Sequence, residues 1–517
     1  MSKPEHLIEG IPMNTRTIVL FMVDQLGAKW LETARSGVVD LPNFNALLAE
    51  STDFTNAFST NPVCSPSRAN IATGLSASGH GVPECGYDLD PDVPTFMQAL
   101  QKSGWTTGGF GKLHFKTQIE QICPDYRPYG FDVVHNTEDT RAGEWLDWVQ
   151  REHPENHEAA KSTVWMTMVP EMRAYGPEAV DLRAEILEAQ RKYPESTQEA
   201  YELPFPAEVS QTAWITDRAC EFLQTSEGNL FAQISYIQPH NPFAPPAEYV
   251  DRVDLTAIPS PLKAEWEQDR IPYYRQERYA QASYDTADWK RQRQLYFADI
   301  AHLDHELGRV REALKTSGRL DNTLFIFTSD HGELLHDHGL LGKWERHYDA
   351  CIRVPLIISG PGLEAGAKDQ LVEHSDIAAT IYHWAGIPEP SLPCRRQGRE
   401  ETMPMLHGRS LLPLMEGKIP HDWRPELFIQ SNNNHVEASP KCWARTIRTN
   451  RYRFTRHLSG GGEQLFDLVS DPHEQTNLAY KNEWQDVRAA LLERLSELSA
   501  TESYPNSPRQ LFQIGAW

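Results

Sequence analysis

Thr17-Ile-Val-Leu-Phe-Met-Val23 is a continuous apolar run that ends at Asp24. An apolar run without polar alternation is typical of a strand buried on both faces, at the centre of a parallel sheet. Three similar runs lie far along the chain, at residues 230–236, 324–328 and 354–358. Together they predict one large sheet with Thr17–Val23 as a central parallel strand.

The segments between these runs include helical patterns. In residues 295–315, leucine or valine recurs every three or four positions, and Gly318 follows as a stop signal. The alternation of strands and helices predicts a doubly wound α/β fold, with a large mixed, mostly parallel sheet flanked by helices. Ligands of such sheets bind beyond the carboxyl ends of the strands, so polar residues just after each strand are the first candidates for a site.

The pattern changes at about residue 407. Short antiparallel strands are expected at 427–430, 443–448 and 451–456, followed by a helix with one apolar face and a capping box of Asn482 and Gln485. We therefore expect a large α/β domain at residues 1–406 and a smaller α+β subdomain at 407–517. Residues 137–208 are rich in charge and interrupt the alternation of strands and helices, which predicts an insertion or lid. The tail after Ser499 is expected to dock on a neighbouring subunit.

The net charge and the cysteines indicate which partners and which cellular compartment are expected. The chain of 517 residues has 49 basic and 72 acidic residues, a net charge of −23, which argues against nucleic acid or an anionic membrane as a partner. A small anionic substrate then needs a local positive pocket. The seven cysteines have no paired spacing, and residues 1–14 lack the pattern of a secretory signal. A cytoplasmic location is expected.

One short element stands out for its chemistry. Cys64-Ser-Pro-Ser-Arg68 places a cysteine two residues before Pro66, and proline suits the first turn of a helix. Cys64 would then lie at the positive end of the helix dipole, where backbone N–H groups stabilise an anion, and Arg68 would lie one turn further on. Most lone cysteines are buried, inert thiols, so the element needs support from the rest of the chain.

Two acidic pairs follow predicted strands. Asp24-Gln25 comes after the first run and Asp330-His331 after the run at 324–328. Either pair alone suits a turn or a cap, but together they would make an oxygen-rich site for a hard divalent cation. The imidazole in the set also suits a transition metal such as manganese.

These elements and three others resemble the formylglycine-dependent sulfatase family of the alkaline phosphatase superfamily. The others are Gly109-Phe-Gly-Lys-Leu-His114, Gln238-Pro-His-Asn-Pro-Phe243 and His338-Gly-Leu-Leu-Gly-Lys-Trp344, and residues 465–478 resemble the family's closing phrase. Taken singly, their lysines and histidines would be surface, core or turn residues. Many members have Asp-Asp and Asp-Asn at the acidic pairs, so Asp-Gln and Asp-His resemble the branch of choline sulfatases and phosphonate monoester hydrolases.

The resemblance implies an alkaline-phosphatase-like fold and a modified residue. A formylglycine-generating enzyme would oxidise Cys64, and the hydrated aldehyde would be the nucleophile. One divalent metal ion, Ca²⁺ by analogy, with Mn²⁺ or Mg²⁺ as alternatives, would be bound by Asp24, Gln25, Cys64, Asp330 and His331. Assembly as a homo-oligomer, dimer or tetramer, is also implied.

The resemblance further implies roles for the cationic residues. The sulfuryl oxygens would be held by Arg68, Lys112 and Lys343, the leaving group protonated by His240 with Lys343, and the second hydroxyl deprotonated by His114. His347 is expected to line the pocket. The expected reaction is hydrolysis of sulfate monoesters. Two alternatives stay open: a phosphonate monoester or phosphodiester hydrolase with the same nucleophile, and a non-catalytic metal- and anion-binding homologue. Hydroxyl-bearing residues stand at the positions of Lys112 and His114 in phosphonate hydrolases, which favours sulfate here.

Overall fold

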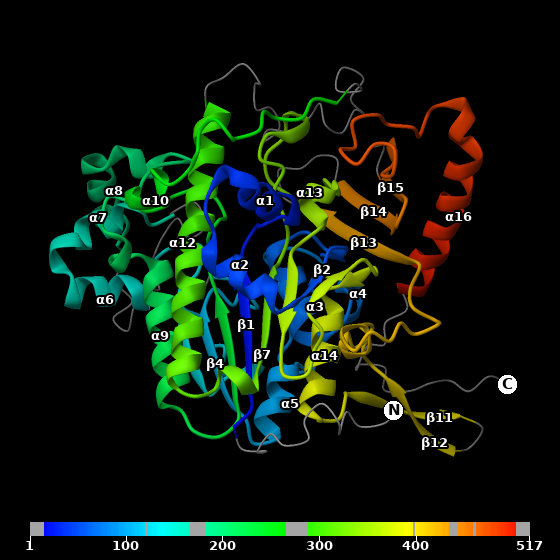
Figure 1. The fold of residues 1–517 in the computed structure, drawn as a ribbon, viewed down its shortest axis with the longest axis horizontal. Coiled ribbons are helices and arrows are strands. Elements are labelled where there is room, and N and C mark those ends of the chain that lie inside the picture. The colour runs from blue at the N-terminus through cyan, green and yellow to red at the C-terminus, as the bar shows by residue number, and fades with distance from the viewer. Residues whose placement is uncertain are drawn as a thin grey trace.

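The computed structural model describes residues 15–118, 122–165, 182–264, 288–396, 399–433, 442–458 and 462–502. A large α/β body carries the central sheet, and a small antiparallel sheet with one long helix lies against one side of it (Figure 1). This is the predicted fold class.

The central sheet has eight strands in the order β5-β4-β6-β1-β7-β8-β2-β9. Its middle strand, β1 (Thr17–Val23), pairs in parallel with β6 (Leu230–Ser235) and β7 (Thr323–Ser329), as the sequence predicted. On the far side of β6 lie β4 (Thr106–Gly111) and β5 (Val133–Asn136), also parallel.

One strand in the other half of the sheet, β8, runs in the opposite direction. The fourth apolar run forms β8 (Leu356–Ser359), which pairs antiparallel with β7, so it does not repeat the parallel design. The chain between β7 and β8 carries site residues but no long crossover helix that would return it to the other end of the strands. β8 therefore starts near the end of β7 and runs antiparallel to it. β2 (Thr52–Phe54) and β9 (Gly366–Lys368) complete the sheet.

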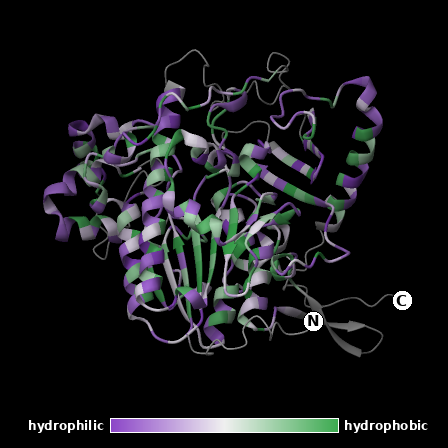
Figure 2. Ribbon diagram, viewed as in Figure 1, coloured by the Kyte–Doolittle hydropathy of each residue, from purple (hydrophilic) through white to green (hydrophobic). Residues whose placement is uncertain are grey.

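Both faces of β1 are buried, which explains its unbroken apolar sequence. Val19, Phe21 and Val23 belong to the core under α9 (Gln211–Thr225) and α12 (Asp288–Thr316). The alternate side chains belong to the core under α3 (Cys64–Thr73), α5 (Phe96–Lys102) and α14 (Ser375–Ala385). Figure 2 shows the hydrophobic residues gathered on the central strands. Each fully buried aliphatic or aromatic side chain contributes about 1.5–3 kcal/mol.

The smaller sheet has one strand more than predicted. Its strands are β13 (Glu426–Asn433), β14 (Cys442–Thr449), β15 (Tyr452–His457) and β16 (Gly462–Asp467), all antiparallel, and α16 (Gln485–Glu502) follows. The predicted capping box is wrong: Gln485 donates from its side chain to the carbonyl oxygens of Ala479 and Lys481, and Asn482 opens a short 3₁₀ turn. The tail beyond residue 502 lies outside the described residues. We retain the division at residue 406 as a proposal.

The remaining short elements surround the two sheets. A hairpin of β11 (Ser391–Arg396) and β12 (Arg399–Pro404) precedes the smaller sheet, and β3 (Ala57–Phe58) pairs with β10 (Val372–Glu373). The short helices are α1 (Ala28–Thr33), α2 (Pro42–Ala49), α4 (Ala77–His80), α6 (Glu144–Glu152), α7 (His157–Ser162), α8 (Arg183–Lys192), α10 (Ala247–Val250), α13 (Asp349–Ile352) and α15 (Leu412–Met415).

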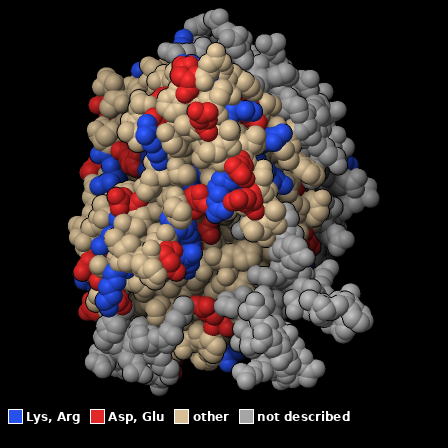
Figure 3. Space-filling view, turned by 90° about the vertical axis from the view of Figure 1, so that its right-hand side faces the viewer, with Lys and Arg blue, Asp and Glu red and all other residues tan. Residues whose placement is uncertain are grey.

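Figure 3 shows basic and acidic side chains interspersed on one face of the molecule. Within the described ranges, no helix has both the length and the apolar character needed to cross a bilayer. The five cysteines whose side chains are described, Cys64, Cys85, Cys123, Cys220 and Cys351, are free thiols.

Candidate active site

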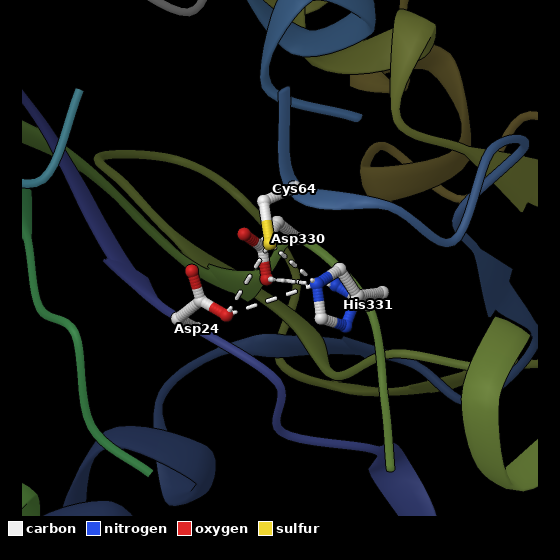
Figure 4. Close-up of side chains that lie close together, drawn as sticks. All are labelled: Asp24, Cys64, Asp330 and His331. Atoms are coloured by element: carbon white, nitrogen blue, oxygen red, sulfur yellow. Dashed lines mark hydrogen bonds and ion pairs between the residues drawn. The ribbon is translucent and has the colours of Figure 1, made fainter. Parts of the chain in front are cut away.

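The predicted site residues converge at the carboxyl end of the parallel strands. Asp24 follows β1 and Asp330 follows β7, while Cys64 begins α3 from the neighbouring layer. In Figure 4 the side chains of Asp24, Cys64, Asp330 and His331 point toward one another. One ligand atom from each of the four lies within 4.8 Å of all the others, and all four residues are buried.

The thiol of Cys64 lies at the start of a helix and among cations. The preceding residue, Val63, is extended, and Pro66 is the third residue of α3, inside its first turn as predicted. The Sγ atom lies 2.8 Å from Lys343 Nζ and 3.2 Å from His331 Nε2. Burial opposes the thiolate, but the neighbouring Cys85 thiol and the nearby cations outweigh it and lower the pKa of Cys64 well below its ordinary value. The site therefore stabilises negative charge at this side chain.

Arg68 links the two acidic pairs. Its Nε donates to Asp330 Oδ2 at 2.8 Å and its Nη2 to Asp24 Oδ2 at 3.0 Å. Its Nη1 donates to the carbonyl of Lys112 at 2.6 Å and to Ser235 Oγ at 2.8 Å. Arg68 is 1% exposed, so in this structure its guanidinium holds the carboxylates rather than facing a substrate.

The remaining donor atoms fit a bound cation. Because Arg68 takes the Oδ2 atoms, the Oδ1 atoms of Asp24 and Asp330 face His331 Nε2 at 3.7 and 3.6 Å. His331 Nδ1 lies 3.0 Å from the carbonyl of Gly332. A carbonyl only accepts, so Nδ1 carries the hydrogen and Nε2 presents its lone pair in the neutral ring.

Gln25 supplies a further observation in favour of a cation. Its Nε2 donates to Glu333 Oε2 at 2.5 Å, and its Oε1 is buried without a hydrogen-bond partner. Two ligands on opposite sides of Ca²⁺ lie about 5 Å apart at the usual 2.3–2.6 Å bond length, so the cluster has the size for one ion. The donors of Asp24, Gln25, Asp330 and His331 thus fit a divalent cation.

Lys112 lies between two carboxylates, one of which the sequence did not single out. Its Nζ is 2.6 Å from Asp24 Oδ2 and 2.6 and 2.7 Å from the two oxygens of Asp139. His114 Nδ1 lies 4.0 Å from Asp139 and is buried without a hydrogen-bond partner. Asp139 falls at the start of the segment predicted to be an insertion. Its place shortly after β5 was the one signal that could have found it.

The other predicted residues divide into two groups. Lys343 is 4% and His240 6% exposed, and the His240 ring lies 6.0 Å from that of Trp165. His240 Nδ1 is 2.5 Å from the carbonyl of Asn241, which leaves Nε2 as the candidate proton donor. His347 instead bonds Thr446 Oγ1 at 2.8 Å and Ser431 Oγ at 3.0 Å, both on the smaller sheet. These contacts do not support its predicted place in the pocket.

Replacing Gly111 by alanine is expected to disturb the site and lower stability by several kcal/mol. Gly111 has a φ of +86°, and a Cβ there would lie 2.0 Å from the carbonyl oxygen of Ser235. Because that oxygen accepts the backbone N–H of Lys112, the clash would move the lysine. Urea unfolding and activity would both report the loss. Gly104→Ala, at φ +84° with open space around it, is the control for the backbone cost alone. Equal losses in the two variants would contradict the role of the close approach.

Comparison with known proteins gives two family-model matches, which overlap at residues 336–387. The Sulfatase family model matches residues 16–387, and a model of the C-terminal part of N-sulphoglucosamine sulphohydrolase matches residues 336–501. An arylsulfatase of Clostridium perfringens is 27% identical over 487 residues, covering 91% of this chain and 91% of that protein. A choline-sulfatase of Rhizobium meliloti is 27% identical over 480 residues, covering 89% and 82%.

A crystal structure of the phosphonate monoester hydrolase of Agrobacterium radiobacter superposes with a TM-score of 0.72 at 24% identity, covering 94% of this chain and 96% of that one. This likeness supports the fold. Since the Sulfatase model spans most of the chain, the protein belongs to the sulfatase family, within the alkaline phosphatase superfamily, and is a sulfatase.

Proposed function

We propose that this sulfatase hydrolyses sulfate monoesters to an alcohol or phenol and inorganic sulfate, with Cys64 as the precursor of the nucleophile. The observation that carries the proposal is the position of the Cys64 thiol. It lies 2.8 Å from Lys343 and 3.2 Å from His331, beside two carboxylates at the start of α3.

The reaction needs a nucleophile, neutralisation of oxyanion charge and a proton for the leaving group. Formylglycine made from Cys64 would supply a hydrated aldehyde, and a divalent cation at Asp24, Gln25, Asp330 and His331 would lower the pKa of its hydroxyl. Ca²⁺ is the proposed ion, with Mn²⁺ and Mg²⁺ as alternatives, since carboxylate and amide oxygens suit Ca²⁺ and an imidazole also suits Mn²⁺.

Other residues of the chain bind the sulfuryl group and transfer protons. Lys112 and Lys343 bind the sulfuryl oxygens, and Arg68 holds the two aspartates in register. His240 Nε2 gives a proton to the leaving oxygen. His114 Nε2 takes the proton whose loss releases sulfate, with Nδ1 directed at Asp139. At 6% exposure each, the two histidines are the more accessible members of the set, which suits groups that exchange protons with substrate and water.

A phosphonate monoester hydrolase is the alternative, supported by the fold of the Agrobacterium radiobacter enzyme. The lysine and histidine at positions 112 and 114 favour the sulfatase. A non-catalytic homologue is disfavoured by the number of cations around Cys64.

The test measures kcat/KM for an aryl sulfate and a phenyl phosphonate ester, together with mass spectrometry of the peptide that contains Cys64. We expect a preference for the sulfate of at least about tenfold and an aldehyde at position 64. A larger rate with the phosphonate would reverse the assignment, and an unmodified thiol in fully active enzyme would exclude the nucleophile. Absence of aldehyde and turnover despite tight metal binding would favour the non-catalytic homologue.

A further inference from the structure

Asp139 is a buried carboxylate that touches the proposed sulfuryl-binding machinery without belonging to the predicted metal site. It is 3% exposed, and both its oxygens bond Lys112 Nζ, at 2.6 and 2.7 Å. Burial opposes its ionisation, but Lys112, His240 and His114 outweigh burial and keep the pKa of Asp139 below its ordinary value.

The neighbouring residue, Glu138, has a different place. Its Oε1 accepts the backbone N–H groups of Leu113 and His114 and the hydroxyl of Tyr126. Glu138 therefore shapes the loop, whereas Asp139 neutralises a cation.

The lysine, arginine and aspartate charges beside Cys64 balance. Among the described residues, the lysines and arginine of the cluster are Arg68, Lys112 and Lys343, and the carboxylates that pair with Arg68 or Lys112 are Asp24, Asp330 and Asp139. Three positive charges thus meet three negative ones. These six side chains together have no net charge, and a bound cation, the nucleophile and the neighbouring Glu138 and His331 add their own charges. Without Asp139 the net charge of the site would be one unit more positive.

We propose that Asp139 is a specificity-determining residue that matches the site to esters with a single negative charge and disfavours phosphate monoesters, which carry two. It acts through Lys112, so it is a positioning residue: it limits the net attraction that this lysine exerts on the transferred group. Because Coulomb attraction is proportional to the charge of the ester, this limit costs a doubly charged ester about twice the attraction that it costs a singly charged one. The inference deepens the proposed function and rests on it.

The test compares Asp139→Asn with the intact, metal-loaded enzyme. Asparagine keeps the shape and one oxygen acceptor for Lys112, and it replaces the other carboxylate oxygen with an uncharged amide NH₂ group. The measured quantity is kcat/KM for 4-nitrophenyl phosphate divided by kcat/KM for 4-nitrophenyl sulfate, at a pH near 8, where a phosphate monoester carries two charges because its second pKa is about 6. We expect this ratio to rise at least tenfold.

A second measurement avoids turnover. Calorimetry with sulfate, a dianion, and methanesulfonate, a monoanion, should show that Asp139→Asn binds the dianion relatively more tightly, by a similar factor. Asp139→Glu retains the charge, so its ratios should stay near the wild-type values even if its rates fall. Asp139→Ser is a second neutral variant for use if Asp139→Asn does not fold.

The matched control is Asp304→Asn. Asp304 is also 3% exposed, but it accepts the backbone N–H of Phe44 and the side chain of Asn43, near the start of α2. Its replacement should leave both ratios unchanged.

Equal losses for both substrates in the neutral variants, with unchanged relative anion binding, would overturn the inference, because a purely structural role lowers all rates together. The proposed function fails separately, if the wild-type enzyme does not hydrolyse aryl sulfates. The charge comparison would then use a singly charged phosphonate ester in place of the sulfate.

Discussion

Replacing Cys64 by alanine should lower turnover by about 10⁴–10⁶-fold, the range found when an essential nucleophile is removed. The thiol lies among Lys343, His331 and Asp24, and no other described thiol lies in this cluster of ligand atoms. The fold should survive, because alanine retains the Cβ and removes one buried sulfur atom. Steady-state assays and circular dichroism would measure both effects.

The control for that variant is Cys220→Ala. Cys220 is half-buried on α9, where its thiol contacts the carbonyl of Arg309 at 3.8 Å. Its loss should leave the rate within about twofold. Full activity in the Cys64 variant would refute the proposed nucleophile.

Serine at position 64 is a sharper probe of the chemistry. Its hydroxyl can accept the sulfuryl group, but the resulting ester has no second hydroxyl on the same carbon through which sulfate could be expelled. We expect at most one equivalent of product in a burst, followed by arrest. Sustained turnover would contradict the scheme.

Asp330→Asn should have the second largest effect, through metal binding and stability together. The substitution removes a charged ligand atom from the cluster and one of the two carboxylates that pair with the buried Arg68, whose Nε lies 2.8 Å from Asp330 Oδ2. Loss of one partner of a buried ion pair costs about 3–5 kcal/mol. Activity should fall by at least about 10³-fold, and elemental analysis should show loss of the bound ion.

Asp376→Asn separates the two effects. Asp376 is fully buried and receives both Nη atoms of Arg424, each at 2.6 Å, but it belongs to α14 rather than to the cluster. This variant should lose comparable stability and keep its metal. If the Asp330 variant retained metal and rate, the assignment of the site would be wrong.

Chelation gives the same test without mutation. A strong chelator should abolish activity and lower the melting temperature, because the ion binds the folded state alone. Adding back Ca²⁺, Mn²⁺ or Mg²⁺ singly should identify the ion by the extent of recovery. Unchanged activity after verified removal of metal would exclude the proposed role.

The sequence predicted those elements whose burial can be recognised from a local pattern of apolar residues. The apolar run at Thr17–Val23 became the central strand because both its faces pack against helices. The strand ends correctly indicated where Asp24, Asp330 and their neighbours meet. The direction of β8 could not be predicted, because an apolar run has the same composition whether it runs parallel or antiparallel to its neighbour. The fourth strand of the smaller sheet was missed for lack of a clear alternation.

By itself, the sequence determined the family, because the residues around Cys64 and the order of the later motifs resemble those of sulfatases. It also indicated which polar side chains follow the parallel strands and therefore lie at the same end of the sheet. Only the tertiary structure decided what each charge faces. In the structure Lys112 pairs with Asp139, and Arg68 donates hydrogen bonds to the two aspartates that follow β1 and β7. His347 bonds to residues of the smaller sheet. Such pairings depend on contacts between distant segments at distances of about 3 Å, and linear spacing does not encode them.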